Sequence, residues 1–138
     1  MPELALLDRL ETKAGDARIT PEEAAAMMRA AMTLFALWDL TDAQARTLLG
    51  APSPRTFARW KKGELGAIPY DTASRLSHLM GIHKALRMLF KEPERGYAWL
   101  RKDNAAFGGQ SALSRMLAGE LVDLAAVRAY LDAERGGW

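Results

Sequence analysis

The amino-acid sequence predicts an all-α protein, and three observations support this fold class. Helix-start signatures occur at residues 20–23 and 41–44, where a threonine precedes a Glu or Gln by three positions, so that each side chain can satisfy the other residue's backbone N–H. Apolar residues then recur three and four positions apart, as they do on one face of a helix. No segment alternates apolar and polar residues for long enough to form a strand.

The first strong helix begins after Thr20, with Pro21 in its first turn, and continues to about Trp38. Additional Met and Ala side chains widen its apolar stripe almost to the full circumference. A helix of this kind is either central in a core or buried at a subunit interface. The weakly patterned residues 1–19 before it are interpreted as an arm that packs on the body or on another copy.

Shorter helices follow, and each has a recognisable start or stop. One begins after Thr41 and stops at Gly50, and the next opens at Ser53 and stops at Gly63. The later signals predict, in order, a loop at 64–70, a long helix from Asp71 or Thr72 to about Phe90, a short helix from Pro93, a turn at 103–109, a helix from Ser111 to Leu117 and a last helix capped by Asp123.

Composition excludes several classes of function. The chain has no cysteine, so it has no disulfide, thiol nucleophile or Cys-based zinc site. Its two histidines, His78 and His83, are separated by about 140° around a helix and share no ligand face, and we expect His83 to be a polar or half-buried helix residue. No Ser–His–Asp order or paired-carboxylate cluster stands out. We therefore expect no catalytic residues, no metal and no cofactor.

Nothing in the sequence points to a membrane. No apolar run is long enough to cross a bilayer, and the first residues lack the positive charge of a secretion signal. We therefore expect a cytoplasmic protein.

The net charge of +2 hides an uneven distribution along the chain. Residues 51–102 contain eleven basic and four acidic side chains, a net charge of +7, whereas residues 1–50 carry −3 and residues 103–138 carry −2. Such a block either binds an anionic partner or forms solvated helix faces.

The helix that opens at Ser53 separates its side chains into two faces. Arg55, Arg59 and Lys62 lie within about 60° of one another, and Phe57 and Trp60 lie on the opposite side. A DNA-recognition helix needs this division, because one face anchors it while arginine on the other can pair with guanine edges in the major groove. We predict that the following residues contact DNA: Ser53, Arg55, Thr56, Arg59, Lys61 and Lys62.

The two capped helices and the run Phe-Ala-Arg-Trp-Lys-Lys-Gly at 57–63 resemble the Xre-type helix-turn-helix. The segment from Gly50 to Trp60 is one residue longer than the usual pattern and carries Pro52 in its turn. This departure makes the base-reading role of single side chains less definite than the groove-binding role of the helix.

From Arg75 onward the chain resembles the toxin-binding domain of Xre/MbcA/ParS antitoxins. The motif of that family is matched at each anchor, by Trp-Leu at 99–100, Asn104, Phe-Gly-Gly at 107–109 and the later Leu and Gly positions of 113–119. Ala112 replaces the usual proline, a small departure that only softens the cap of the helix there. The resemblance implies an arm (1–19), a helix-turn-helix domain (20–70) and a helical toxin-binding domain (71–138).

The resemblance also implies a function. Antitoxins of this kind cover the active-site entrance of a RES-domain toxin, which consumes NAD or uses it for ADP-ribosylation, and they tend to repress their own operon. It places the toxin contacts at Asn104, Phe107, Gly108, Gly109, Ser111, Leu113, Met116 and Leu117, and in the tail Arg135, Gly136, Gly137 and Trp138. A tail with a terminal Trp suits a binding hot spot, although it can equally be a frayed end.

Two other functions fit the residues. The chain could be a stand-alone transcription regulator with a helical dimerisation domain, or an interaction module whose helix-turn-helix is vestigial. We also expect a homodimer, because operators for this motif are usually two-fold and the helix after Thr20 is apolar enough to be buried twice.

Overall fold

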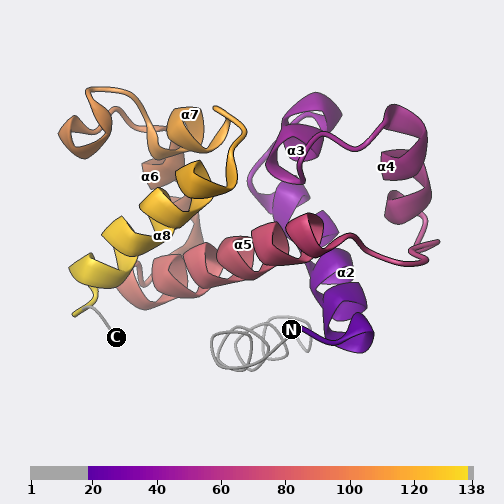
Figure 1. Ribbon diagram of the computed structural model, residues 1–138. Helices are drawn as coiled ribbons and strands as arrows, with labels where there is room; N and C mark the ends of the chain where they lie inside the picture. Colours follow the sequence, from indigo (N-terminus) through magenta and orange to yellow (C-terminus); the bar gives the residue numbers. More distant parts are fainter. Residues whose placement is uncertain (1–18, 137–138) are drawn as a thin grey trace.

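The computed structural model describes residues 19–136, and in this part of the chain the regular elements are helices joined by turns and loops, with no strand (Figure 1). The all-α prediction is therefore confirmed. The helices are α2 (Pro21–Leu37), α3 (Asp42–Leu48), α4 (Pro54–Lys61), α5 (Tyr70–Leu89), α6 (Pro93–Arg101), the short 3-10 helix η1 (Ala105–Phe107), α7 (Ala112–Met116) and α8 (Leu121–Glu134). The predicted arm lies outside the described residues, except for Ile19.

Reciprocal side-chain caps begin the first two of these helices, as the sequence predicts. The Thr20 hydroxyl accepts a hydrogen bond from Glu23 N (3.1 Å), and the Glu23 carboxylate accepts one from Thr20 N (2.9 Å). Thr41 and Gln44 make the same pair of bonds at 3.1 and 3.0 Å. These bonds satisfy backbone N–H groups that have no partner within the helix.

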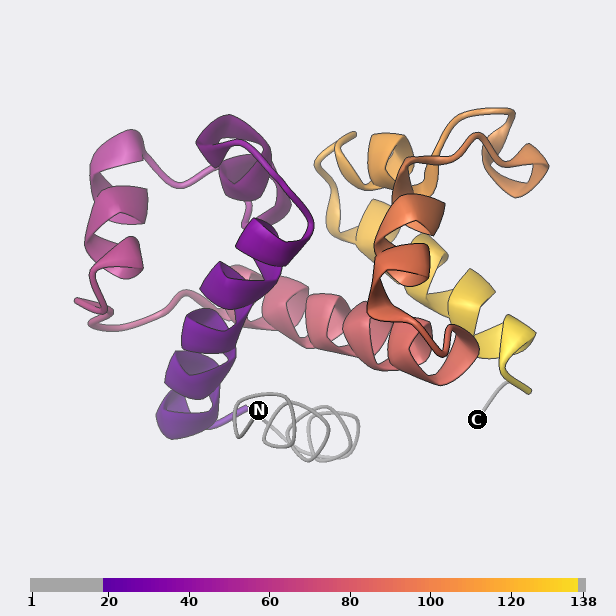
Figure 2. The same ribbon diagram turned by 180° about the vertical axis from the view of Figure 1, so that it is seen from behind.

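Helix α5 is the longest described helix, and the other helices pack along it. Helices α2, α3 and α4 gather at one end of it, and α6, α7 and α8 gather at the other, as both views show (Figures 1 and 2). The axis of α8 comes close to α5 at Gly81, where an added Cβ would overlap the Arg128 guanidinium. The buried apolar side chains of the two ends form one continuous cluster along α5.

Helix α2 lies inside this cluster. Seven of its side chains are buried, and Leu37 is its one large apolar residue with substantial exposure, 40%. Its nearly complete apolar circumference is therefore explained by a central place in the core of a single chain, and it does not by itself support a subunit interface.

Two expectations about single residues are wrong. Asp123 does not precede the last helix: α8 begins at Leu121, and Asp123 reaches back from the first turn to accept a hydrogen bond from Glu120 N at 3.0 Å. His83 is not half-buried but 1% exposed. Helices cover α5 on more than one side, so a residue such as His83 is buried even though the sequence pattern did not place it on the apolar stripe.

Candidate functional surfaces

The turn between α3 and α4 contains two successive residues with left-handed backbone, Gly50 (φ +93°) and Ala51 (φ +60°). Arg46 stabilises the turn with both its backbone and its side chain. Its carbonyl accepts a hydrogen bond from Ala51 N (2.7 Å), and its Nε donates one to the Pro52 carbonyl (2.9 Å). This local network accommodates the extra residue of the turn and delivers the chain to the start of α4.

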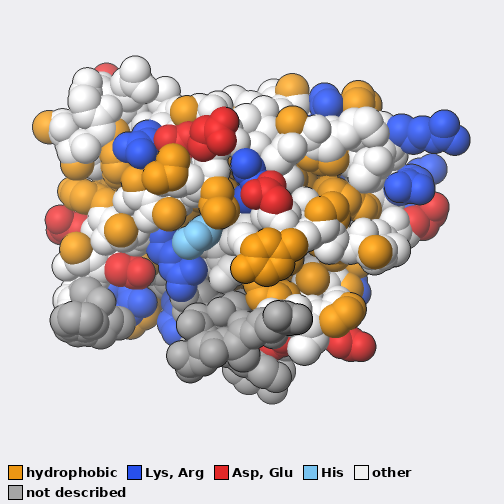
Figure 3. Space-filling model, in the orientation of Figure 1, with side chains coloured by type: hydrophobic (Ala, Val, Ile, Leu, Met, Phe, Trp, Pro, Cys, Tyr) orange, Lys and Arg blue, Asp and Glu red, His pale blue; other side chains and the backbone are white. Residues whose placement is uncertain are grey.

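Helix α4 shows the two faces that its sequence predicts. Phe57 and Trp60 are buried, 4% and 5% exposed, and they anchor the helix to the core. Arg55, Arg59 and Lys62 are exposed. Basic side chains project from the edge of the molecule over α4 in Figure 3. This edge combines a rigid helix with an exposed cationic face, which is the arrangement that major-groove recognition requires.

The two hydroxyl residues at the start of α4 are bonded to each other. Ser53 Oγ accepts a hydrogen bond from Thr56 N (3.1 Å) and donates one to Thr56 Oγ1 (3.1 Å). Both were predicted to contact DNA. Their hydroxyls serve first as the cap of the helix, so a phosphate contact there would share or replace this bond.

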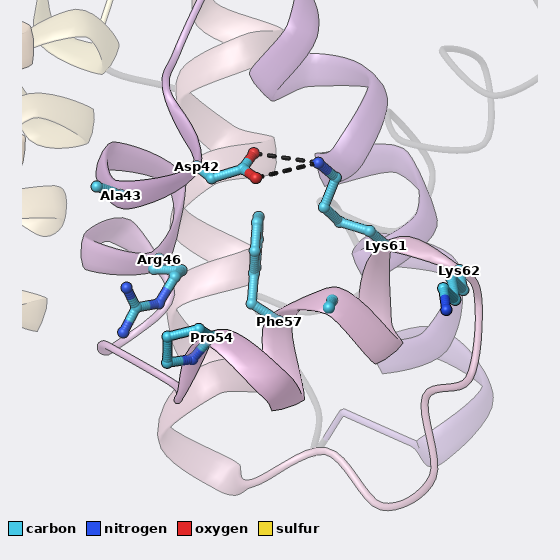
Figure 4. A pocket seen from close by; sticks show the side chains of 8 residues that line it. Asp42, Ala43, Arg46, Pro54, Phe57, Lys61 and Lys62 are labelled. Carbon is cyan, nitrogen blue, oxygen red and sulfur yellow. Dashed lines mark hydrogen bonds and ion pairs between the residues drawn. The ribbon is translucent and has the colours of Figure 1, made fainter.

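Lys61 points away from the other cations and toward α3. Its Nζ lies 3.1 and 3.3 Å from the two carboxylate oxygens of Asp42, and 5.7 Å from the centre of the Phe57 ring. The pair spans a groove of about 380 Å³ between α3 and α4, whose lining also includes Arg46, Pro54 and Lys62 (Figure 4). Lys61, which was predicted to contact DNA, thus already has an anionic neighbour.

The basic block of residues 51–102 does not form one surface. Arg75 is buried, pairs with Asp71 (Nε–Oδ2 2.8 Å) and points its Nη1 at the last carbonyls of α3. Arg101 donates from Nη2 to the carbonyls of Trp38 (2.8 Å) and Asp39 (2.9 Å), just past the end of α2. These two arginines join helices, Arg75 from a buried position and Arg101 from the surface, and both lie at helix ends, where the carbonyls favour positive charge.

At the other end of α5, three aromatic rings from three elements form a cluster at the surface. Trp99 of α6 stacks on Tyr130 of α8, with ring centres 6.0 Å apart, and Phe107 of η1 meets both edge-on, at 6.4 and 5.3 Å. All three side chains are half-buried. Phe107 was predicted to contact the partner protein, but Trp99 and Tyr130 were missed. The Trp-Leu motif at 99–100 was the signal that pointed to this cluster.

A compact loop positions Phe107. Asn104 organises it: its side-chain Oδ1 accepts from Ala106 N (2.9 Å), its carbonyl accepts from Gly109 N (3.0 Å), and its N–H donates to Gln110 O (3.0 Å). Gly108 and Gly109 have φ values of +67° and +86° and are exposed. The loop therefore exposes glycine backbone beside the aromatic cluster.

The remaining predicted partner contacts are scattered. Ser111 caps α7 by accepting from Ser114 N (3.0 Å). The side chains of Leu113 and Met116 are buried and support the segment from the core side, while Leu117 is half-buried.

Arg135, the first residue of the predicted tail, does not share the aromatic surface. Arg135 pairs with Asp132 (3.2 Å) and lies about 140° around α8 from Tyr130. Figures 1 and 2 show the end of α8 and the η1 loop at different heights. Gly136 is exposed, and the contacts predicted for Gly137 and Trp138 lie outside the described residues.

Asp123 and His78 are two of the titratable groups in residues 71–136 whose pKa values are shifted. The hydrogen bond from Arg115 to Asp123 (2.8 Å) holds the pKa of the Asp123 carboxyl below its usual value. Burial lowers the pKa of His78, whose Nδ1 lies 3.5 Å from Arg128 Nη1. Within residues 19–136 there is no group of three or more His, Asp or Glu side chains that could hold a metal ion. None of the helices described here has the length and apolar character to span a membrane.

Comparison with known proteins gives two family matches. Residues 17–81 match the antitoxin Xre-like helix-turn-helix domain, and residues 85–137 match the antitoxin Xre/MbcA/ParS C-terminal toxin-binding domain. The chain is also 50% identical over 100 residues to the uncharacterized protein y4oB of Sinorhizobium fredii, which is 72% of this chain and 77% of that protein. No solved structure matches the chain at a significant level.

Proposed function

The chain belongs to the Xre/MbcA/ParS antitoxin family, and on that basis we propose that it neutralises a RES-domain toxin by covering the entrance to its active site. The observation that carries this proposal is the match of residues 85–137 to a toxin-binding domain. The same segment contains the exposed loop and the aromatic cluster, both suited to a protein interface because aromatic side chains dominate binding hot spots. The toxin would consume NAD or use it for ADP-ribosylation.

A second activity is proposed for the other end of the molecule. Helix α4 would enter the major groove of operator DNA and repress the operon that encodes the chain. The exposed Arg55 and Arg59 would read bases, and Lys62 would bind phosphate. Because operators read by this motif are usually two-fold, we propose that the protein acts as a homodimer. It would act in the cytoplasm, where both the operon and NAD are found.

Co-expression with the protein encoded by the neighbouring gene tests the toxin arm of this proposal. We expect the two proteins to co-purify, and we expect the partner's NAD consumption to fall when this chain is added. A partner that keeps its full NAD-consuming activity in the presence of excess chain would contradict the proposal.

The double variant Arg55→Ala/Arg59→Ala separates the two activities. Both side chains are exposed on α4, far along α5 from the aromatic cluster. We expect the variant to lose binding to the DNA upstream of its own gene, by roughly 30-fold or more if each arginine contributes about 1–3 kcal/mol, and to neutralise the toxin normally. Loss of both activities in a variant that still folds would contradict this separation.

A further inference from the structure

One carboxylate stands among the cations of the helix-turn-helix. Between residues 41 and 62 the chain has five basic side chains and a single acidic one, Asp42. That carboxylate lies on the groove between α3 and α4, where both of its oxygens are within 3.3 Å of Lys61 Nζ (Figure 4). The two side chains remain open to solvent, with 49% of Lys61 and 69% of Asp42 exposed. The pair therefore lies on the surface and not in the core.

Asp42 is not needed to begin its helix. The cap of α3 is completed by Thr41 and Gln44, whose side chains satisfy each other's backbone N–H groups. An exposed ion pair also adds little to the stability of a protein. The placement of a carboxylate beside Lys61 thus has little structural consequence, and its effect must be sought in binding.

We propose that Asp42 is an electrostatic brake on DNA binding, which compensates the charge of Lys61 and so removes one cation from the phosphate-binding set. This inference rests on the proposed DNA-binding function. In a helix-turn-helix the first helix crosses the DNA backbone while the second lies in the groove, which brings α3 and its carboxylate close to phosphates. Lys61 already has an anionic partner, so its contact with a phosphate would release no further counterion.

The brake would act on the sequence-independent part of DNA binding. Non-specific affinity comes from cations that neutralise phosphates, whereas specificity comes from contacts with base edges. Asp42 would weaken the first while Arg55 and Arg59 retain the second. Because the same phosphate contact is made on any sequence, Asp42 would lower specific and non-specific affinity by a similar factor, and the ratio between them would stay set by the base contacts.

The test measures binding of the full chain to a 30-bp duplex of arbitrary sequence by fluorescence anisotropy, over roughly 50–200 mM NaCl. In Asp42→Asn we expect the slope of log K against log salt to steepen by about 0.9, the value for one additional phosphate contact. At about 100 mM salt the affinity should rise several-fold, by up to roughly tenfold.

Two further variants identify the mechanism. If Asp42→Asn acts by freeing Lys61 from its ion pair, the increases in affinity and in salt slope should disappear in the double variant Asp42→Asn/Lys61→Gln. The matched control is Asp39→Asn, which removes the same charge three positions earlier, from an exposed residue beside Arg101 at the end of α2. Asparagine tolerates the left-handed backbone of this position (φ +56°), and we expect no change of slope.

The outcomes separate this inference from the proposed function. If the wild type binds DNA and Asp42→Asn shows the same salt slope as the wild type, the brake is overturned and the DNA-binding proposal stays intact. An equal gain in Asp39→Asn, or a gain that persists without Lys61, also overturns it, because net charge alone would then be responsible. If neither the wild type nor Asp42→Asn binds DNA at low salt, both the brake and the DNA-binding proposal are overturned.

Discussion

Two glycines end the helices of the helix-turn-helix in the same backbone conformation but in different surroundings. Gly50 follows α3 with φ +93°, and Gly63 follows α4 with φ +88°. A Cβ at Gly50 would lie 3.0 Å from Asp71 Oδ2 and 3.2 Å from Arg75 Nε, whereas a Cβ at Gly63 would have no neighbour within 4 Å. Substitutions at the two glycines therefore separate backbone strain from crowding of the Arg75–Asp71 ion pair.

We expect Gly63→Ala to lower the free energy of unfolding by about 1 kcal/mol, which is the cost of a left-handed alanine. Gly50→Ala should lower it by roughly 2–3 kcal/mol, since strain is joined by displacement of the Arg75–Asp71 contact. Urea unfolding followed by circular dichroism measures both. Equal losses in the two variants would show that the contact with Arg75 has no energetic weight.

We expect His78 to make the folding stability of the protein depend on pH. Burial holds its pKa below the ordinary value of 6.5, so the unfolded chain takes up a proton at a higher pH than the folded chain. The contribution of neutral His78 to the free energy of unfolding is therefore fully present above pH 6.5. It decreases as the pH falls below 6.5, by at most about 1.4 kcal/mol per pH unit. Solvent around this half-buried ring keeps the effect below that ceiling.

Melting temperatures at pH 7.5, 6.5 and 5.5 check this expectation. The wild type should melt at a lower temperature at pH 5.5 than at pH 7.5, and His78→Gln should reduce the difference, because glutamine does not titrate. The same pH dependence in both proteins would assign the effect to other groups.

At the level of elements, α6, η1 and α8 each contribute one ring to the aromatic cluster. No single element presents this surface, because Trp99, Phe107 and Tyr130 meet only when the three elements pack together. The cluster is also a part of the toxin-binding segment where aromatic side chains stay partly open to solvent beside an exposed glycine loop.

We expect Phe107→Ala to weaken toxin binding by at least about 2 kcal/mol, or roughly 30-fold, which is the threshold for a hot-spot residue. Tyr70→Ala is a matched control, because Tyr70 is 81% exposed at the start of α5, near the helix-turn-helix. Calorimetric titration with the toxin measures both, and circular dichroism verifies the fold. Comparable losses in the two variants would remove the cluster from the interface.

At the level of the whole molecule, the two ends are joined by the long helix α5 and by the core packed along it. The two matched family segments meet within α5, between residues 81 and 85, and the buried core continues across that point. Arg101 adds a polar connection, since α6 belongs to one end and the carbonyls of Trp38 and Asp39 belong to the other. We therefore expect a single cooperative unfolding transition.

Arg101→Ala should lower the free energy of unfolding by about 1–2 kcal/mol, because two carbonyls lose a charged hydrogen-bond donor. Arg101→Lys should recover part of this loss. Lys102→Ala is the control, since Lys102 is the exposed neighbour of Arg101. Denaturant unfolding measures all three. An Arg101→Ala variant as stable as Lys102→Ala would show that the connection is not energetically important.

The positions of most helices and the two faces of α4 could be predicted from the sequence alone. The caps at Thr20, Thr41, Ser53 and Ser111 could be read directly, because each bonds to a backbone N–H three residues away. The separation of Arg55 and Arg59 from Phe57 and Trp60 follows from the helical period alone. Information of this kind lies within one or two helical turns of the chain.

Which basic side chains are free of ion pairs and which aromatic rings meet could not be predicted from the sequence, because both depend on how the helices pack. Lys61 and Asp42 are 19 positions apart, and Arg101 is 63 positions from Trp38. Trp99, Phe107 and Tyr130 come from three separate elements. No periodicity relates such residues, because their distances are set by how α3, α4, α6 and α8 pack around α5. Packing thus separates the basic side chains of residues 51–102. Some form the exposed cationic face of α4, and two arginines, Arg75 and Arg101, join helices.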